Sequence, residues 1–187
     1  MVIHEHNHFD IRNVGGILLE KLVIKGGNQL NGRVRVSSAK NAVLPIIAAT
    51  LLASTPSKLL EIPNLEDVGT ISQVIESLGV KITRNEADDE IIFDASMLTA
   101  TEAPYELVRK MRASFLVMGP LLARKGEAKI SMPGGCAIGA RPIDLHLKAF
   151  EALGAKIEIT EDYVYAHAPE GLQGTQIYLD FPSVGAT

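Results

Sequence analysis

The sequence predicts an α/β protein built from a repeated unit of helices and strands. From Lys21 onward, segments with the apolar spacing of helices alternate with short strand-like segments. The order helix, strand, helix, strand, strand occurs twice, and parts of the two copies match in sequence. The composition, 47% hydrophobic and 21% charged over 187 residues, is typical of a globular chain that buries a core of its own.

The first copy follows a strand pair that we expect at residues 22–24 and 33–36, across a Gly- and Asn-rich turn. Asn41 is the expected N-cap of the first helix, with Pro45 in its first turn. The second helix is expected to end at Gly79. The remaining elements expected in this copy are a helix, a strand, a helix and two strands, at residues 42–53, 58–62, 68–78, 80–83 and 90–93.

The second copy begins with a helix expected over residues 104–122, where large apolar side chains recur at helical spacing. A strand at 128–132 and a helix at 142–153 follow. Two strands at Lys156–Ile159 and Tyr163–His167 close the copy.

The two copies differ by an insertion. Residues 51–53 match residues 121–123 at an offset of 70, whereas residues 76–82 match residues 151–157 at an offset of 75. The second copy therefore carries five extra residues between its first strand and its second helix. Because a short connection needs no added glycine-rich length for packing, we interpret the insertion as functional.

The repeat also predicts the domain organisation. Residues 1–20 are expected to be an N-terminal extension, and residues 21–187 to hold units at about 22–97 and 98–168. A third unit begins at about residue 171, with a strand-like stretch at 176–179, and stops at Thr187. A helix that is cut in its first turn leaves its backbone groups and its apolar face without partners. We therefore expect the chain to be a fragment of something longer.

Cys136 is the main catalytic candidate, and it lies in the inserted loop between Gly134-Gly135 and Arg141. A thiol near a helix N-terminus and a cationic side chain is placed to act as a nucleophile or a general acid. The alternative is a buried cysteine that packs as a small hydrophobe, the commoner fate of cysteine in general. The loop setting favours the functional interpretation.

Charged residues at helix starts are candidate anion sites. Arg141, Pro142 and Asp144 surround one helix start, where free N–H groups and a cation suit a phosphate, although Asp144 equally suits the helix dipole alone. Lys40 and Asn41 open the first helix. Arg109, Lys110 and Arg112 crowd one helix, and an ordinary solvated face is the commoner explanation of such a cluster.

Several classes of protein are disfavoured. The net charge of −4 gives no basic field for nucleic acid, and no segment has the length of a membrane span or the pattern of a signal peptide. The single cysteine fits a reducing cytoplasm. No metal-ligand spacing or P-loop is present, and His146 and His167 are expected to be structural. The alternating His4, His6 and His8 are interpreted as a loose terminus rather than as a metal site.

Five stretches together resemble the UDP-N-acetylglucosamine enolpyruvyl transferase family, from about Leu22 to the last residue. They are Ala39-Lys40-Asn41-Ala42-Val43-Leu44-Pro45, Lys110-Met111-Arg112-Ala113-Ser114, Leu121-Leu122-Ala123-Arg124, residues 133–144 with His146, and Ser183-Val184-Gly185-Ala186-Thr187.

The resemblance implies a fold and an activity. The fold is an α/β one of repeated β/α units, the inside-out α/β barrel of the enolpyruvyl transferases, here with its second domain missing. The implied reaction moves enolpyruvate from phosphoenolpyruvate to the 3′-hydroxyl of UDP-N-acetylglucosamine and releases phosphate. It is the first committed step of peptidoglycan precursor synthesis, and hence of cell-wall biogenesis, cell shape and cell division. It requires no cofactor.

The resemblance also implies residue roles. Cys136 is the general acid that protonates the methylene carbon; it can also become attached to phosphoenolpyruvate, and fosfomycin alkylates it. Lys40 and Asn41 contact phosphoenolpyruvate, and Arg112 contacts the nucleotide sugar. The UDP-sugar site is lined by two stretches, Arg141, Pro142, Ile143, Asp144 and Leu145, and Phe181, Pro182, Ser183 and Val184.

Two departures and two rivals accompany the resemblance. Ser38 stands where the family commonly has glycine, and the chain ends before the family's second domain, so we expect it to be inactive alone. One rival is the shikimate-pathway enolpyruvyl transferase, which the Cys136 loop disfavours. The other is a non-catalytic, truncated UDP-sugar-binding module. The oligomeric state is left open.

Overall fold

The computed structural model of the chain describes residues 12–14, 17–19, 26–27, 29, 31–85, 90–109, 111–132 and 143–183. The chain divides into two compact units, Met1–Ser37 and Ser38–Thr187. In the first unit, β1 (Arg12–Val14) pairs antiparallel with β2 (Ile17–Leu19). Sequence analysis found no pattern here, because three-residue strands are too short for alternation to be recognised.

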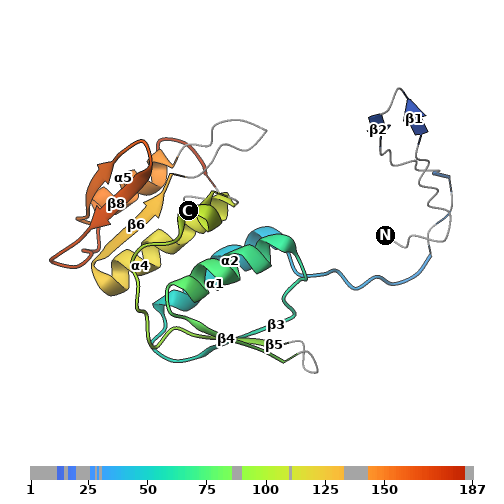
Figure 1. Cartoon of the computed structure of the whole chain (residues 1–187), viewed down its shortest axis with the longest axis horizontal. Coiled ribbons are helices and arrows are strands. Elements are labelled where there is room, and N and C mark those ends of the chain that lie inside the picture. Colours follow the sequence, from blue (N-terminus) through green and yellow to red (C-terminus); the bar gives the residue numbers. More distant parts are fainter. Residues whose placement is uncertain are drawn as a thin grey trace. The chain divides into compact units, whose positions relative to one another are not determined.

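The second unit holds two three-stranded sheets with helices against them (Figure 1). Its elements in chain order are α1 (Lys40–Ala49), η1 (Thr50–Leu52), β3 (Ser57–Leu60), α2 (Glu66–Ser77), β4 (Lys81–Asn85), β5 (Glu90–Asp94), α3 (Tyr105–Val108), η3 (Arg112–Val117), α4 (Met118–Lys125), β6 (Glu127–Ser131), α5 (Asp144–Ala152), β7 (Lys156–Ile159) and β8 (Tyr163–His167).

Both sheets have the same topology. Their strand orders are β3-β5-β4 and β6-β8-β7, and every pairing is antiparallel. In each sheet the two outer strands run parallel and are joined by a helix, α2 or α5, since parallel strands need a crossover connection. The last strand then returns between them. The predicted order of strand, helix, strand and strand is thus present in both halves.

Each sheet buries one face. Ile91 and Phe93 point inward from β5, and Val164 and Ala166 do so from β8, in strict alternation. Helices α1 and α2 lie side by side in the first half (Figure 1). The buried residues of both halves form one continuous cluster, so a single core spans the two sheets.

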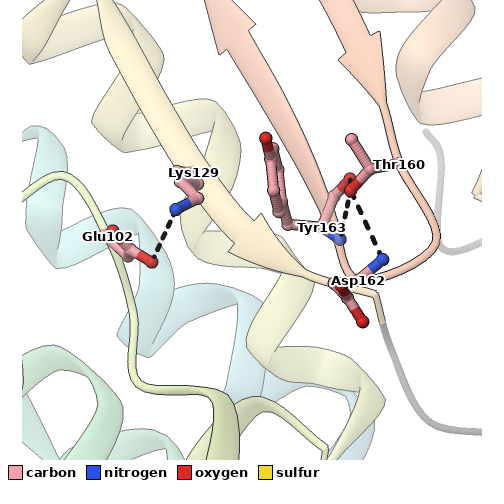
Figure 2. A network of polar contacts seen from close by, with 5 residues as sticks. All are labelled: Glu102, Lys129, Thr160, Asp162 and Tyr163. Atoms are coloured by element: carbon pink, nitrogen blue, oxygen red, sulfur yellow. Dashed lines mark hydrogen bonds and ion pairs between the residues drawn. The ribbon is translucent and has the colours of Figure 1, made fainter.

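The chain between the halves adds to the second sheet. Lys129 of β6 donates its backbone N–H to Thr101 O at 2.9 Å, and Ala103 N donates to Lys129 O at 3.3 Å. The Lys129 ammonium lies 3.0 Å from Glu102 and 4.5 Å from the centre of the Tyr163 ring. Figure 2 shows the three side chains together. These contacts fix the linker to the edge strand β6.

A tight turn joins β7 to β8 at the same end of that sheet. The Thr160 hydroxyl accepts hydrogen bonds from the backbone N–H groups of Asp162 and Tyr163, at 3.3 and 3.1 Å (Figure 2). A hydroxyl that bonds the next backbone amides is the usual way in which Ser and Thr stabilise turns.

The strands of the second sheet confirm the sequence prediction closely. Lys156–Ile159 and Tyr163–His167 are strands at the predicted residues, and β3, β4, β5, β6 and α5 agree to within a few residues. Gly79 follows α2 as expected, with a φ of 102°. The predicted strand at 22–24 lies outside the described residues.

The predicted strands at 33–36 and 176–179 are wrong, because neither segment is a strand. Val36 is 87% exposed and Tyr178 is 83% exposed. A strand forms when its N–H and C=O groups find a partner strand, and the described part of the chain offers these two segments none.

The continuous helix predicted over 104–122 is also wrong. Met111 is extended, with φ −145° and ψ 120°, and the stretch divides into α3, the 3-10 helix η3 and α4. A proline inside a long helix loses a hydrogen bond and clashes with the preceding turn. Pro120 avoids both costs by standing in the first turn of α4.

Helix α1 begins earlier than predicted. Its N-cap is Ala39, with no side-chain capping bond, and Asn41 lies inside the helix rather than capping it. Pro45 is consequently the sixth residue of α1, beyond the first turn. Among the described residues no helix is long and apolar enough to cross a bilayer.

Candidate functional site

The start of α1 presents Lys40 and Asn41 to solvent. The first amides of a helix have no acceptor within it, and the helix dipole makes this end partly positive. In α1 the first turn holds no acidic residue, and the cap supplies no side-chain acceptor. An anion placed here would meet unopposed N–H groups and the Lys40 ammonium.

Lys40 forms an ion pair with Asp67, in the first turn of α2, at 2.5 Å between Nζ and Oδ2. The Lys40 side chain is 52% exposed, so the pair lies at the surface of the protein. Asp67 was not among the candidates from the sequence. No local spacing indicates it, because the contact joins two helices whose packing is set by the core.

Arg112 opens η3, directly after the extended Met111. The structure describes the backbone of Arg112 and not its side chain, and Lys110 lies outside the described residues. Arg109, the third cation of this cluster, lies over the Tyr105 ring at 5.5 Å from its centroid.

The start of α5 holds three of the candidates. Ile143 is the N-cap and its side chain is buried in the core, Leu145 is buried as well, and Asp144 is exposed. Backbone N–H groups of His146 and Leu147 both donate to Ile143 O, which closes the first turn. Cys136, Arg141 and Pro142 lie outside the described residues.

His146 packs beside the start of this helix as an edge-to-face partner of Phe115, with ring centroids 5.8 Å apart and planes at 85°. His167 stacks on Tyr165 at 6.2 Å. Both contacts are with aromatic side chains of the fold, in keeping with the structural roles expected for the two histidines.

The described part of the last candidate stretch, residues 181–183, follows β8 and has no regular structure. Phe181 and Pro182 are exposed, Ser183 is half-buried, and Val184 lies outside the described residues. Asp180, just before this stretch, pairs with Lys148 of α5 at 2.7 Å. The structure thus connects α5, which starts with one candidate stretch, to the chain that carries the other.

Besides Asp67, two further ion-pair partners were not predicted from the sequence, namely Lys148 and Asp180. One signal was available: Lys148 lies four residues after Asp144 and so shares its side of the helix. The carboxylate that Lys148 meets depends on the path of the chain after β8. That part of the sequence has no periodicity from which the path could be predicted.

Comparison with known proteins places these features in a family. The sequence profile of EPSP synthase (3-phosphoshikimate 1-carboxyvinyltransferase) matches residues 24–187. A UDP-N-acetylglucosamine 1-carboxyvinyltransferase 2 from Carboxydothermus hydrogenoformans is 60% identical over 169 residues, which cover 90% of this chain and 40% of that protein. A UDP-N-acetylglucosamine 1-carboxyvinyltransferase 1 from Staphylococcus aureus is 57% identical over 170 residues, with the same coverage. The chain spans about two fifths of the length of these curated relatives.

Solved structures agree on the fold. The enolpyruvyl transferase NikO from Streptomyces tendae superposes with a TM-score of 0.65 at 26% identity, over 79% of this chain and 32% of that one. An EPSP synthase from Acinetobacter baumannii superposes with a TM-score of 0.50 at 13% identity, over 89% of this chain and 39% of that one. The predicted fold class, repeated β/α units of the enolpyruvyl transferase kind, is confirmed. On its sequence and its fold, this chain belongs to the EPSP synthase family of enolpyruvyl transferases.

Proposed function

We propose that this chain is part of a UDP-N-acetylglucosamine 1-carboxyvinyltransferase and carries the general acid of that reaction, Cys136. The enzyme would transfer enolpyruvate from phosphoenolpyruvate to the 3′-hydroxyl of UDP-N-acetylglucosamine and release phosphate. The observation that carries the proposal is the 60% identity over 169 residues to a relative of that name. The reaction would serve peptidoglycan synthesis in the cytoplasm, with fosfomycin as an inhibitor.

The proposed chemistry is an addition followed by an elimination. In the addition, Cys136 delivers its proton to the methylene carbon of phosphoenolpyruvate, while the sugar 3′-hydroxyl gives up its proton to a base and its oxygen bonds to the neighbouring carbon. In the elimination, the carbon–oxygen bond to phosphate breaks and the phosphate takes up the proton of the former hydroxyl. The methyl group returns one proton to the Cys136 thiolate, which restores both the double bond and the thiol. Both substrates are polyanions, so Lys40, Arg112 and Arg141 would neutralise charge that builds up between them.

The described residues support separate roles for the two helix starts. At α1, the exposed Lys40 ammonium beside unopposed backbone amides suits the phosphate or carboxylate of phosphoenolpyruvate. At α5, the side chains of Ile143 and Leu145 are buried, so in this proposal they meet the nucleotide sugar through their backbone. The exposed Asp144 is available to bond a sugar or base directly.

A first experiment tests the Cys136 assignment. Incubation with fosfomycin should add one inhibitor molecule to the chain, and peptide mass spectrometry should locate it on Cys136. The Cys136→Ser variant is the matched control and should stay unmodified. An unmodified wild-type chain would argue against a reactive thiol in this loop.

A second experiment tests the substrate. Calorimetric or NMR titration should detect weak binding of UDP-N-acetylglucosamine and none of shikimate 3-phosphate. The opposite preference would favour the shikimate-pathway rival, whose name the matching family profile bears. Binding of the UDP-sugar without any fosfomycin adduct would favour the non-catalytic binding module.

A third experiment tests activity. Because the chain spans about two fifths of its relatives' length, we expect no phosphate release when the 187-residue chain is mixed with both substrates. Robust turnover would contradict this expectation, while leaving the family and the substrate assignment intact.

A further inference from the structure

The chain that follows β8 is attached to α5 at two points. Leu172 is half-buried against the core, and the next residue, Gln173, donates its backbone N–H to Leu153 O at 2.8 Å. Leu153 is the C-cap of α5. Further along, the Asp180 carboxylate pairs with the Lys148 ammonium at 2.7 Å.

These two attachments give the segment a direction. Its first contact is at the end of α5, and its second is five residues nearer the start of that helix. The segment therefore runs antiparallel to α5, toward the first turn. Lys148 lies four residues from Asp144, about 6 Å along the helix axis. The three residues after Asp180 can span about 10 Å, so Phe181–Ser183 lies within reach of the start of α5.

The middle of this segment has no regular backbone pairing within the described chain. Within the part of the chain that the structure describes, residues 174–182 make no backbone–backbone hydrogen bond. A segment without such bonds opens locally at low cost, and side-chain contacts decide where it rests. The Lys148–Asp180 pair is placed immediately before Phe181, where it has the most control over the residues that follow.

We propose that Lys148 is a positioning residue for the nucleotide-sugar site. Through Asp180 it holds Phe181, Pro182 and Ser183 beside the first turn of α5, where Ile143, Asp144 and Leu145 stand. This inference rests on the proposed function, which assigns both stretches to the UDP-sugar. Lys148 itself acts on the ligand only through Asp180 and the residues that it orders.

The strength of the pair suits such a role. Its side chains are 47% and 62% exposed, and an exposed ion pair shifts a local equilibrium by about two- to five-fold and weakens in salt. Loss of the pair should therefore loosen the segment without unfolding the core, which the cluster of buried apolar residues holds together.

The experiment compares four variants of the full 187-residue chain. Lys148→Met and Asp180→Asn each break the pair, and Lys148→Glu combined with Asp180→Lys restores it with reversed charges. Lys125→Met removes an exposed lysine at the end of α4 and is the matched control. The first measurement is hydrogen exchange of the Phe181 and Ser183 amides, and the second is the Kd for UDP-N-acetylglucosamine.

Each single variant should speed exchange at these amides about three-fold and raise the Kd about three-fold. The charge-reversed pair should return both values toward wild type, and Lys125→Met should leave both unchanged. The same loosening should follow when wild type is measured in 1 M NaCl.

Hydrogen exchange and the Kd together distinguish a failure of the positioning role from a failure of the proposed function. Unchanged hydrogen exchange in Lys148→Met overturns the inference. Faster exchange with an unchanged Kd for the UDP-sugar also overturns it. So does a charge-reversed pair that fails to bring the exchange rate and the Kd back toward wild type. A wild-type chain that does not bind the UDP-sugar at all refutes the proposed function. In that case the exchange data still decide whether the pair positions the segment, and the nucleotide-sugar role is withdrawn.

Discussion

At Gly79 the backbone leaves α2 with a φ of 102°, a conformation that side chains with a Cβ rarely adopt. A Cβ at this position would lie 2.5 Å from Thr99 Oγ1 and 2.7 Å from Met97 O. Gly79→Ala combines backbone strain with a clash, and we expect it to lower the free energy of unfolding by about 2 kcal/mol or more. Urea denaturation measures the loss.

Gly69, inside α2, is the matched control for that substitution. A Cβ there meets no atom within 4 Å, and alanine is preferred over glycine in a helix by about 0.5–1 kcal/mol. Gly69→Ala should therefore stabilise the chain. Equal effects at the two positions would contradict the positive-φ explanation.

Arg124 is a second residue whose neighbours make a clear prediction. Its Nη1 donates to Leu51 O at 3.0 Å, to Ala53 O at 2.9 Å and to Ala95 O at 2.7 Å, which ties α4 to the first half. Arg124→Met leaves these half-buried carbonyls without their donor, at a cost of about 1–3 kcal/mol. The midpoint of urea unfolding should fall accordingly, whereas exposed Lys125→Met should change it little. A midpoint shift no larger than that of the control would show that water replaces the guanidinium.

At the scale of elements, the outer face of the second sheet holds a small polar network. Glu127 of β6 accepts hydrogen bonds from the Tyr165 hydroxyl of β8 at 3.0 Å and from Thr101 at 3.1 Å. The hydrogen bond to Glu127, together with partial burial, raises the pKa of Tyr165 above its ordinary value. A raised pKa means that the folded state binds this proton more tightly than the unfolded state does.

The network therefore predicts a pH dependence in the alkaline range. The stabilisation by Tyr165 should be fully present below the unfolded pKa, near 10, and should be lost as pH rises through the higher folded pKa. Thermal unfolding of wild type and Tyr165→Phe at a series of pH values should show a wild-type advantage that disappears in strong alkali. Tyr178→Phe, at a site that is 83% exposed, should show no such change. A wild-type advantage that is constant with pH would exclude the linkage.

For the whole molecule, the continuous core predicts cooperative unfolding of the two sheets. Phe93 in the first sheet and Ile130 in the second are both fully buried in the same cluster. Phe93→Ala and Ile130→Ala should each cost about 2–5 kcal/mol. Each should lower a single transition, followed by both circular dichroism and tyrosine fluorescence. Two separate transitions, each sensitive to one substitution, would show that the halves fold independently.

Sequence periodicity predicted best where local pattern and packing agree. β7 and β8 were predicted to the residue, because apolar and polar residues alternate along both segments in the sequence, and in β8 this alternation matches one buried face. The helix predicted over 104–122 failed because its apolar spacing is compatible with three shorter helical pieces. The spacing of Val108, Met111 and Phe115 indicates that these side chains are buried, but it does not require one continuous helix. All three are buried in the structure although the backbone is extended at Met111.

The residues of the candidate site also divide into those that local sequence can indicate and those that it cannot. Lys40, Asn41 and Asp144 could be placed near helix starts because such positions follow from local sequence, and their binding roles stay predictions. Asp67, Lys148 and Asp180 were not found, because their contacts join segments 27 and 32 residues apart in the sequence. Such pairs depend on where the core places each element.

The amino-acid sequence by itself determined the α/β class, the repeated order of helices and strands, and the family motifs around Lys40 and Cys136. These are local properties, set by side-chain period, turn chemistry and short-range identity. Only the tertiary structure decided that residues 33–36 and 176–179 are not strands, that the helix breaks at Met111, and that Lys148 holds Asp180. Strand pairing and ion pairing need a partner from elsewhere in the chain, and the packing of the core decides which partner is within reach.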